Sequence, residues 1–197
     1  VPACPCSETE PRMLKITDDR PTLVGNRIRM EPLEARHAAP LWDAIAPGDI
    51  TKWFPYPIRS LQDMEKFIAD AEAQRTAGTS IPFATIDLAS GKPIGSSRFM
   101  NIVRANRVVE IGSTFVAAAF QRTGVNREAK LLQLTHAFEV WKCNRVEFKT
   151  DSLNEKSRAA LSGIGALDEG IFRNHVICHD GRLRHSAWFS IVAEEWP

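Results

Sequence analysis

The chain has 197 residues, of which 44% are hydrophobic and 25% are charged, and these values are typical of one globular domain. Its 25 basic and 24 acidic residues give a formal net charge of +1, so no overall field favours nucleic acid or an anionic membrane as a partner. No apolar run approaches the about 18 residues that a membrane-spanning helix needs. The first six residues lack the basic start and apolar block of a signal peptide, and we therefore expect a cytoplasmic protein.

The cysteines and histidines form no pattern typical of a metal site. Cys4 and Cys6 are too close for a relaxed disulfide, and neither Cys143 nor Cys178 belongs to a Cys-x-x-Cys motif. We therefore expect free thiols. Three histidines also lack ligand spacing: His37, His136 and His185. The sequence predicts no bound metal.

The N-terminal part of the chain predicts a tail followed by a strand. Residues 1–22 contain four prolines and several charges, which is typical of a flexible or loosely attached segment. Residues 23–33 are expected to form a first strand, in which Ile28 and Met30 alternate with Arg27 and Arg29 as in a half-buried strand. We expect a single folded domain over residues 23–197.

Two helices are expected next, at 34–45 and 60–78. Ser60 is a good N-cap for the second helix because the acidic Asp63 stands three positions later. An aromatic, proline-stiffened loop at 53–57 separates the two helices.

Apolar periodicity then predicts the remaining elements. In chain order these are strands at 82–88, 93–103 and 107–117, a helix at 125–141, a strand at 145–150, a helix at 154–164, and strands at 166–178 and 184–193. The whole order is β-α-α-β-β-β-α-β-α-β-β. It predicts an α/β (α+β) fold with one mixed central sheet.

The run from Phe120 to Lys130 is the most informative segment of the sequence. It follows an apolar strand with a short loop that contains Gly124, and it opens a long amphipathic helix. The first turn of a helix has unpaired N–H donors and a partial positive charge, which together favour phosphate binding. We therefore expect a phosphorylated ligand at this loop.

This loop and several other segments, in this order, resemble the GNAT superfamily of acyl-CoA-dependent N-acyltransferases, and most closely its RimJ/RimL-type branch. The similar segments are Val109–Gly112, Gln121–Asn126, Asn144–Val146, Asn154–Ser157, Leu167–Gly170, Arg173–His175 and Asp180–Arg182. The resemblance covers residues 23–197. One position departs from the family pattern: Asn126 stands where a small residue is common, and it could donate to a phosphate or cap the helix.

The resemblance implies acetyl-CoA as the acyl-donor cosubstrate and a set of residues that bind it. The pantetheine arm would lie against the strand near Phe115 and Val116. Those expected at the pyrophosphate and the rest of the cofactor are Gln121, Arg122, Thr123, Gly124, Val125, Asn126, Arg127, Asn154 and Lys156.

Acyl transfer needs a proton donor for the leaving thiolate. Many members of the superfamily use a Tyr, but the only tyrosine here is Tyr56, far upstream. In the RimJ/RimL-type branch a Ser takes this role, and Ser157 stands at the matching position. Alternatively, Ser157 binds its own helix backbone or orients the cofactor.

Two residues are candidates for the catalytic base. Glu110 is an isolated acid in an apolar strand, although it could instead form a structural ion pair with Arg98 or Arg107. His175 matches a position where some relatives carry a carboxylate, although it could equally be a surface or strand-packing histidine.

The acceptor is expected to be a primary amine, either a protein N-terminus or a small amino compound. A free α-amine has a pKa of about 7.7–8.0 and needs a weaker base than a lysine side chain, near 10.4. Trp53, Phe54 and Tyr56 could border the acceptor pocket, or they could form a small satellite core.

The sequence thus predicts an N-acetyltransferase that works by direct transfer in a ternary complex. The alternatives are a non-catalytic acyl-CoA-binding module on the same fold, or an enzyme with a different acyl donor. We expect no nucleic-acid or membrane partner, and a monomer or homodimer.

Overall fold

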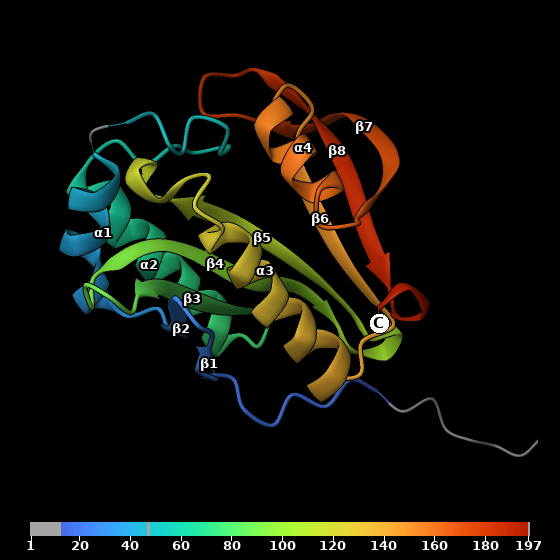
Figure 1. Cartoon of the computed structure of the whole chain (residues 1–197). Helices are drawn as coiled ribbons and strands as arrows, with labels where there is room; N and C mark the ends of the chain where they lie inside the picture. Colours follow the sequence, from blue (N-terminus) through green and yellow to red (C-terminus); the bar gives the residue numbers. More distant parts are fainter. Residues whose placement is uncertain (1–12, 47, 197) are drawn as a thin grey trace, which may run out of the picture.

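A computed structural model of the protein describes residues 13–46 and 48–196. Its centre is one eight-stranded sheet with the order β1-β2-β3-β4-β5-β6-β8-β7. Helices α3 and α4 cover one face of this sheet, and α1 and α2 cover the other (Figure 1). The predicted mixed α/β architecture is confirmed.

The strand predicted at 23–33 is wrong in one respect, because it is broken into a small hairpin. Strand β1 (Leu23–Val24) pairs antiparallel with β2 (Ile28–Pro32), and Gly25 N donates to Ile28 O at 2.9 Å in the turn. Gly-Asn at 25–26 is a turn signal that the alternation of the flanking residues concealed.

The other elements agree with the sequence patterns within a few residues. A short 3₁₀ turn leads into α1 (Ala38–Ile45), and α2 (Leu61–Thr76) begins after Ser60, whose Oγ accepts from Asp63 N at 3.1 Å as predicted. The remaining bounds are β3 (Ser80–Asp87), β4 (Pro93–Val103), β5 (Val108–Val116), α3 (Val125–Thr135), β6 (Arg145–Asp151), α4 (Glu155–Ser162), β7 (Leu167–Ile177) and β8 (Leu183–Val192). A π-helical turn at His136–Val140 continues α3.

Strands β5 and β6 run parallel but pair over only three residues. The pairs join Val108 to Arg145, Val109 to Val146 and Glu110 to Glu147. Beyond Glu110, the two strands part, so the edge of β5 that faces β6 has no strand partner in the described chain. Helix α3 follows β5 and α4 follows β6, and both helices therefore begin near the wide end of this opening (Figure 1).

A bulge in β5 lies beside this opening. Gly112 pairs with Arg98 of β4, but Phe115 pairs with Ser96, so β5 contains one extra residue between these pairs. Ser113 takes up the irregularity with a φ of 49°, which is uncommon for a residue other than glycine.

The bulge changes which face of the sheet the side chains of β5 meet. Before it, Val109 and Ile111 belong to the core on the α3 side; after it, Phe115 packs into the second core, between the sheet and α1 and α2. Because side chains alternate along a strand, Glu110 points to the α1 and α2 side.

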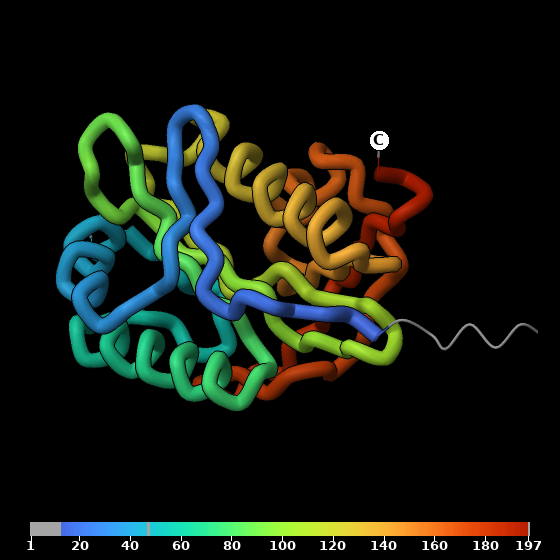
Figure 2. The backbone as a smooth tube through the Cα atoms, turned by 90° about the horizontal axis from the view of Figure 1, so that it is seen from below, coloured from blue at the N-terminus to red at the C-terminus, as the bar shows by residue number. Residues whose placement is uncertain are grey.

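Residues 13–22, which we expected to belong to a flexible tail, pack against the domain. Leu14 is 3% exposed within the α3-side core, and its N–H donates to Arg104 O at 2.9 Å. In Figure 2 this segment runs alongside the connection between β4 and β5. The rest of the predicted tail, residues 1–12, lies outside the described residues.

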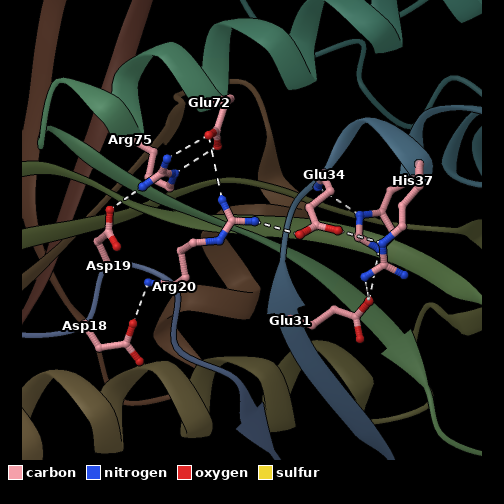
Figure 3. A network of polar contacts seen from close by, with 9 residues as sticks. Asp18, Asp19, Arg20, Glu31, Glu34, His37, Glu72 and Arg75 are labelled. Carbon is pink, nitrogen blue, oxygen red and sulfur yellow. Dashed lines mark hydrogen bonds and ion pairs between the residues drawn. The ribbon is translucent and has the colours of Figure 1, made fainter.

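A polar network fastens the same segment to α2 and to the start of α1 (Figure 3). Arg75 of α2 contacts Asp19 and donates to Glu72 at 2.7 Å, and Arg20 donates to Glu34 at 2.6 Å. Residues 18–20, which were predicted to be part of a flexible tail, are therefore held against the domain by ion pairs.

Glu31 is the least exposed carboxylate of this network. Its oxygens accept from Arg29 at 2.8 Å, from Arg36 at 2.8 Å and from the buried His37 ring at 3.1 Å. Burial alone would raise the pKa of Glu31, but the hydrogen bonds from Arg29 and His37 and the nearby guanidinium charges outweigh it and lower this pKa below its ordinary value. The folded state therefore favours the ionised form.

The lowered pKa of Glu31 predicts a loss of stability in acid. The contribution of Glu31 should be present above its ordinary pKa of 4.5 and disappear as the pH falls through the lower folded value. Glu31→Gln should be about 1–2 kcal/mol less stable at pH 7 and should show a shallower loss of unfolding free energy below pH 4.5. Urea unfolding between pH 7 and 3 measures both. Glu65→Gln, an exposed control on α2, should match the wild type; equal slopes for all three proteins would contradict the prediction.

Candidate functional site

The predicted phosphate loop has the backbone geometry that anion binding needs. It leads from β5 through a 3₁₀ turn into α3, and Arg122 and Gly124 adopt left-handed φ values of 62° and 93°. The first backbone bond of α3 is from Glu128 N to Gly124 O at 2.9 Å. The N–H groups of the three residues from Val125 to Arg127 therefore have no partner within the helix. They lie at the positive end of the helix dipole.

The loop is held in place by the turn between β1 and β2, which sequence reasoning did not identify. Glu128 Oε1 accepts from Asn26 N at 2.5 Å and from Arg27 N at 2.9 Å. The Arg27 guanidinium contacts the Thr123 carbonyl, which belongs to the loop itself. A Cβ on Gly25 would lie only 2.2 Å from Glu128 Oε1, so a side chain at residue 25 would displace the Glu128 carboxylate from its present position.

Asn126, the one irregular residue of the loop, does not cap the helix. Gly124 is the N-cap of α3, so Asn126 lies within its first turn. Its Oδ1 is buried without a hydrogen-bond partner among the described residues. We considered two roles for Asn126, as a helix cap and as a side-chain donor to a ligand. The second role is still a proposal.

Phe115 and Val116, the two residues expected beside a pantetheine arm, are the last two residues of β5. Both pair with β4 on one side, and their other edge faces the opening toward β6. The Phe115 side chain is buried against Phe54 and Phe67, which leaves only its backbone for a ligand in the opening. Gln121 Nε2 donates to Val116 O at 3.1 Å and so joins the loop to the end of β5.

Ser157 comes from α4, on the far side of the opening from α3. Asn154 caps this helix by accepting from Ser157 N at 3.2 Å. The Ser157 hydroxyl is half-buried and forms no hydrogen bond with another described residue, so it does not bind its own helix backbone. Lys156 is exposed beside it.

Glu110 is 2% exposed at the narrow end of the opening. Its Oε2 lies 3.1 Å from Lys149 Nζ of β6 and accepts from Asn101 Nδ2 at 2.7 Å. The ion-pair partners that we considered for Glu110, Arg98 and Arg107, are wrong, because Lys149 is the partner. Lys149 was missed because the neighbour of β5 in the sheet cannot be read from local periodicity.

His175 lies near the C-terminal end of β7, and its side chain is on the same face of the sheet as Glu110. Its Nδ1 is 3.0 Å from Ser186 Oγ, and its ring packs against Phe172 and Trp188. Lys149 Nζ lies 5.0 Å from the Trp188 ring centroid, so Lys149 stands between Glu110 and this aromatic group. Burial lowers the pKa of His175, and the charges of Lys149 and Arg184 lower it further, which favours the neutral ring at pH 7.

The three aromatic residues of the α1–α2 loop divide between core and surface. Phe54 packs between Phe67 and Phe115 in the second core, as the satellite-core alternative proposed. Trp53 is half-buried and Tyr56 is 74% exposed.

The α1–α2 loop also contacts the turn between β7 and β8. His179 N donates to Pro55 O at 2.9 Å, and Arg184 Nη1 donates to Trp53 O at 3.4 Å. A cavity of about 160 Å³ lies between the loop and this turn, lined by Lys52, Trp53, Phe54, Cys178, His179, Asp180 and Arg182.

The described part of the chain contains no group of three or more His, Cys, Asp or Glu side chains that could hold a metal ion. Within residues 13–46 and 48–196, no helix is both long and apolar enough to cross a membrane.

Comparison with known proteins agrees with this geometry. A family described as "Acetyltransferase (GNAT) domain" matches residues 27–166, which is more than half of the chain. The chain belongs to the GNAT acetyltransferase family. The crystal structure of a GCN5-related N-acetyltransferase from Brucella melitensis is similar, with a TM-score of 0.85 and 32% identity over 94% of this chain and 84% of that one.

Two relatives bear on the branch of the GNAT family. "Putative ribosomal N-acetyltransferase YdaF" of Bacillus subtilis (strain 168) is 33% identical over 109 residues, 55% of this chain and 58% of the relative. The match therefore spans less than two thirds of that relative. Mycobacterium smegmatis RimJ, solved in complex with CoA-disulfide, shares the GNAT fold with a TM-score of 0.77 and 23% identity over 90% of each chain. The sequence match to the Bacillus relative supports the RimJ/RimL-type branch, and the RimJ structure shows the shared fold.

Gly25→Ala is predicted to disturb the loop from a distance. The new methyl group would displace the Glu128 carboxylate and remove its hydrogen bonds to Asn26 and Arg27. We expect this to weaken the free energy of coenzyme A binding by about 1 kcal/mol, which corresponds to a roughly fivefold increase in Kd. Isothermal titration calorimetry with coenzyme A measures the affinity. Gly48→Ala, at another glycine without a positive φ, is the control; wild-type affinity in Gly25→Ala would contradict the prediction.

Proposed function

We propose that the protein transfers the acetyl group of acetyl-CoA directly to a primary amine. One observation carries the proposal: a helix start with unpaired N–H groups lies at the end of β5, and the same strand leaves its edge free toward β6 beyond the buried Glu110. A long ligand with a phosphate at one end and an amide-rich arm fits such a combination. Membership of the GNAT family supports acetyl-CoA as that ligand.

The donor would be held mainly by backbone groups. The N–H groups from Arg122 to Arg127 would bind the pyrophosphate, with the side-chain NH2 of Asn126 as a further donor, and Gln121, which donates to Val116 O, would hold the loop in place. The pantetheine amides would pair with the free edge of β5 near Phe115 and Val116 like an added strand. Asn154 and Lys156 would contact the donor from the start of α4.

In the proposed reaction the amine nitrogen attacks the thioester carbonyl carbon. An amide bond forms, the carbon–sulfur bond breaks, and coenzyme A leaves as a thiol. A backbone N–H at the β5 bulge would stabilise the negative charge that develops on the carbonyl oxygen. No covalent intermediate with the protein is needed.

Glu110 is our candidate for the base, with His175 as the second. The Glu110 carboxylate is buried on the face opposite α3 and α4, and it contacts Lys149 Nζ and Asn101 Nδ2. His175 is held neutral by its lowered pKa, so it could accept a proton through a water molecule.

Ser157 is our candidate for the proton donor to the leaving thiolate. Its hydroxyl is not engaged by a described residue, and it comes from the helix that flanks the opening opposite α3. A proton would then enter from the α4 side while the amine loses its own on the Glu110 side.

For the acceptor, we propose an α-amine, either of a protein N-terminus or of a small amino compound. Near pH 8 about half of an α-amine is already neutral, whereas a lysine side chain is almost fully protonated, so an α-amine makes a smaller demand on the base. The exposed Tyr56 and the half-buried Trp53 would border this acceptor. The printed name of the Bacillus relative supports a ribosomal protein as one class to test.

The decisive experiment is incubation with acetyl-CoA and a panel of N-terminal peptides and small amines. Thiol release should accompany a mass gain of one acetyl group on the acceptor. Coenzyme A binding without turnover on any amine would instead favour the non-catalytic module, and turnover with longer acyl-CoA alone would change the donor.

Ser157→Ala should lower kcat about 100-fold and leave the affinity for acetyl-CoA almost unchanged, because the hydroxyl would act only on the leaving group. Ser162→Ala, exposed on the same helix, serves as the control. Equal losses of kcat and acetyl-CoA affinity would reassign Ser157 to cofactor binding.

Glu110→Gln should show a pH-dependent defect. At pH 6.5 the amine is mostly protonated and needs a base, so kcat/KM should fall about 100-fold; above the amine pKa of about 8 the defect should shrink. Rates from pH 6 to 9.5 measure it. Glu147→Gln alters the neighbouring carboxylate of β6 on the same face and should have little effect. A constant defect at every pH would mean that Glu110 acts through structure.

A further inference from the structure

A buried lysine lies directly behind the bulge of β5. Lys130 of α3 is 4% exposed, and its Nζ donates to Thr114 Oγ1 at 2.7 Å and to Ser97 Oγ of β4 at 3.2 Å. Gln133 places Oε1 3.0 Å from Ser97 Oγ and 3.5 Å from the same Nζ. Thr114 follows Ser113, the residue with a φ of 49°. These contacts define a bulge cluster of Ser97, Thr114, Lys130 and Gln133, which joins α3, β4 and β5.

The charge of Lys130 has no counterion among the described residues. No carboxylate forms an ion pair with it, and the other members of the bulge cluster are neutral. Burial alone lowers the pKa of Lys130 to about 7. An ammonium group that is buried without a carboxylate costs free energy, and an apolar side chain of similar length would cost less. The demands of a stable core therefore do not explain a lysine at this position.

The position of the cluster suggests a different reason. The bulge lies beyond the last β5–β6 pair, so the backbone there is held by β4 on one side only. A bulge leaves backbone groups outside the ladder, and a slip by one residue would reverse which side chains meet which face. Thr114 is the first residue after the bulge whose side chain is anchored on the α3 side.

We propose that Lys130 is a positioning residue for acyl transfer, because it holds Thr114 from the α3 side and so fixes the bulged backbone of β5 beside the opening toward β6. This inference rests on the proposed function, in which the thioester lies in that opening. Lys130 acts through Thr114 and not on the reacting atoms. Donors to a developing oxyanion must be placed to within a fraction of an ångström, and a single anchored side chain can supply that precision.

Lys130→Met tests the proposal, because methionine keeps the length and apolar stem but cannot donate. We expect kcat to fall roughly 10- to 100-fold while the Kd for coenzyme A stays within about twofold, since the phosphate loop is untouched. The melting temperature should not fall. Hydrogen exchange of the amides at 112–116, followed by mass spectrometry, should become faster.

Thr114→Val removes the other end of the same contact at nearly constant volume. It should reproduce most of the kcat loss of Lys130→Met, and the double variant should lose clearly less than the product of the two single losses, because both variants remove the Lys130–Thr114 bond; each also removes a bond to Ser97 Oγ. Losses that multiply in the double variant would overturn the proposal.

Lys66→Met makes the same substitution on the exposed side of α2 and serves as the control. Wild-type kcat together with wild-type exchange at 112–116 in Lys130→Met would also overturn the proposal. If the wild-type protein turns over no amine, the proposed function fails, and hydrogen exchange still decides the role of Lys130: faster exchange supports it as the anchor of the bulge, and unchanged exchange refutes it.

Discussion

The early end of the parallel pairing between β5 and β6 leaves an unpaired strand edge in the middle of the sheet, and the proposed ligand site depends on this edge. The two strands share a ladder only as far as Glu110 and Glu147, and each then leads toward the start of its own helix. Backbone groups along the remaining edge of β5 need other partners, because an unpaired buried amide is costly. A ligand that carries amides along its length can satisfy this edge, and the start of α3 can hold its anionic end.

The polar residues around the opening are divided between the two faces of the sheet. On one face, Glu110 is paired with Lys149 and accepts a hydrogen bond from Asn101. On the other face, Lys130 is buried among neutral oxygens and has no carboxylate partner. The bulge at Ser113 lies between the two environments, only a few residues from Glu110. Strand β5 therefore carries both the candidate base and the backbone N–H groups proposed as donors.

The sequence was sufficient to predict most of the element order, the short loop and helix start after β5, and the family, because each depends on local periodicity or on motifs close in the chain. It was not sufficient for contacts between distant segments. The partner of Glu110 is Lys149, which becomes a neighbour only when β6 joins β5. The support of the loop by Glu128 and Arg27 and the burial of Leu14 likewise depend on tertiary packing, and no local pattern indicates them.

The contact between Glu128 and the turn at Gly25–Arg27 also has a consequence for how the protein folds. The two segments are separated by about a hundred residues, and such distant pairings form late because a long loop must close first. During synthesis, the turn of the β1–β2 hairpin therefore cannot contact Glu128 until α3 has been made. The loop before α3 can therefore reach its final shape only after the turn at Gly25–Arg27 and the start of α3 have been brought together.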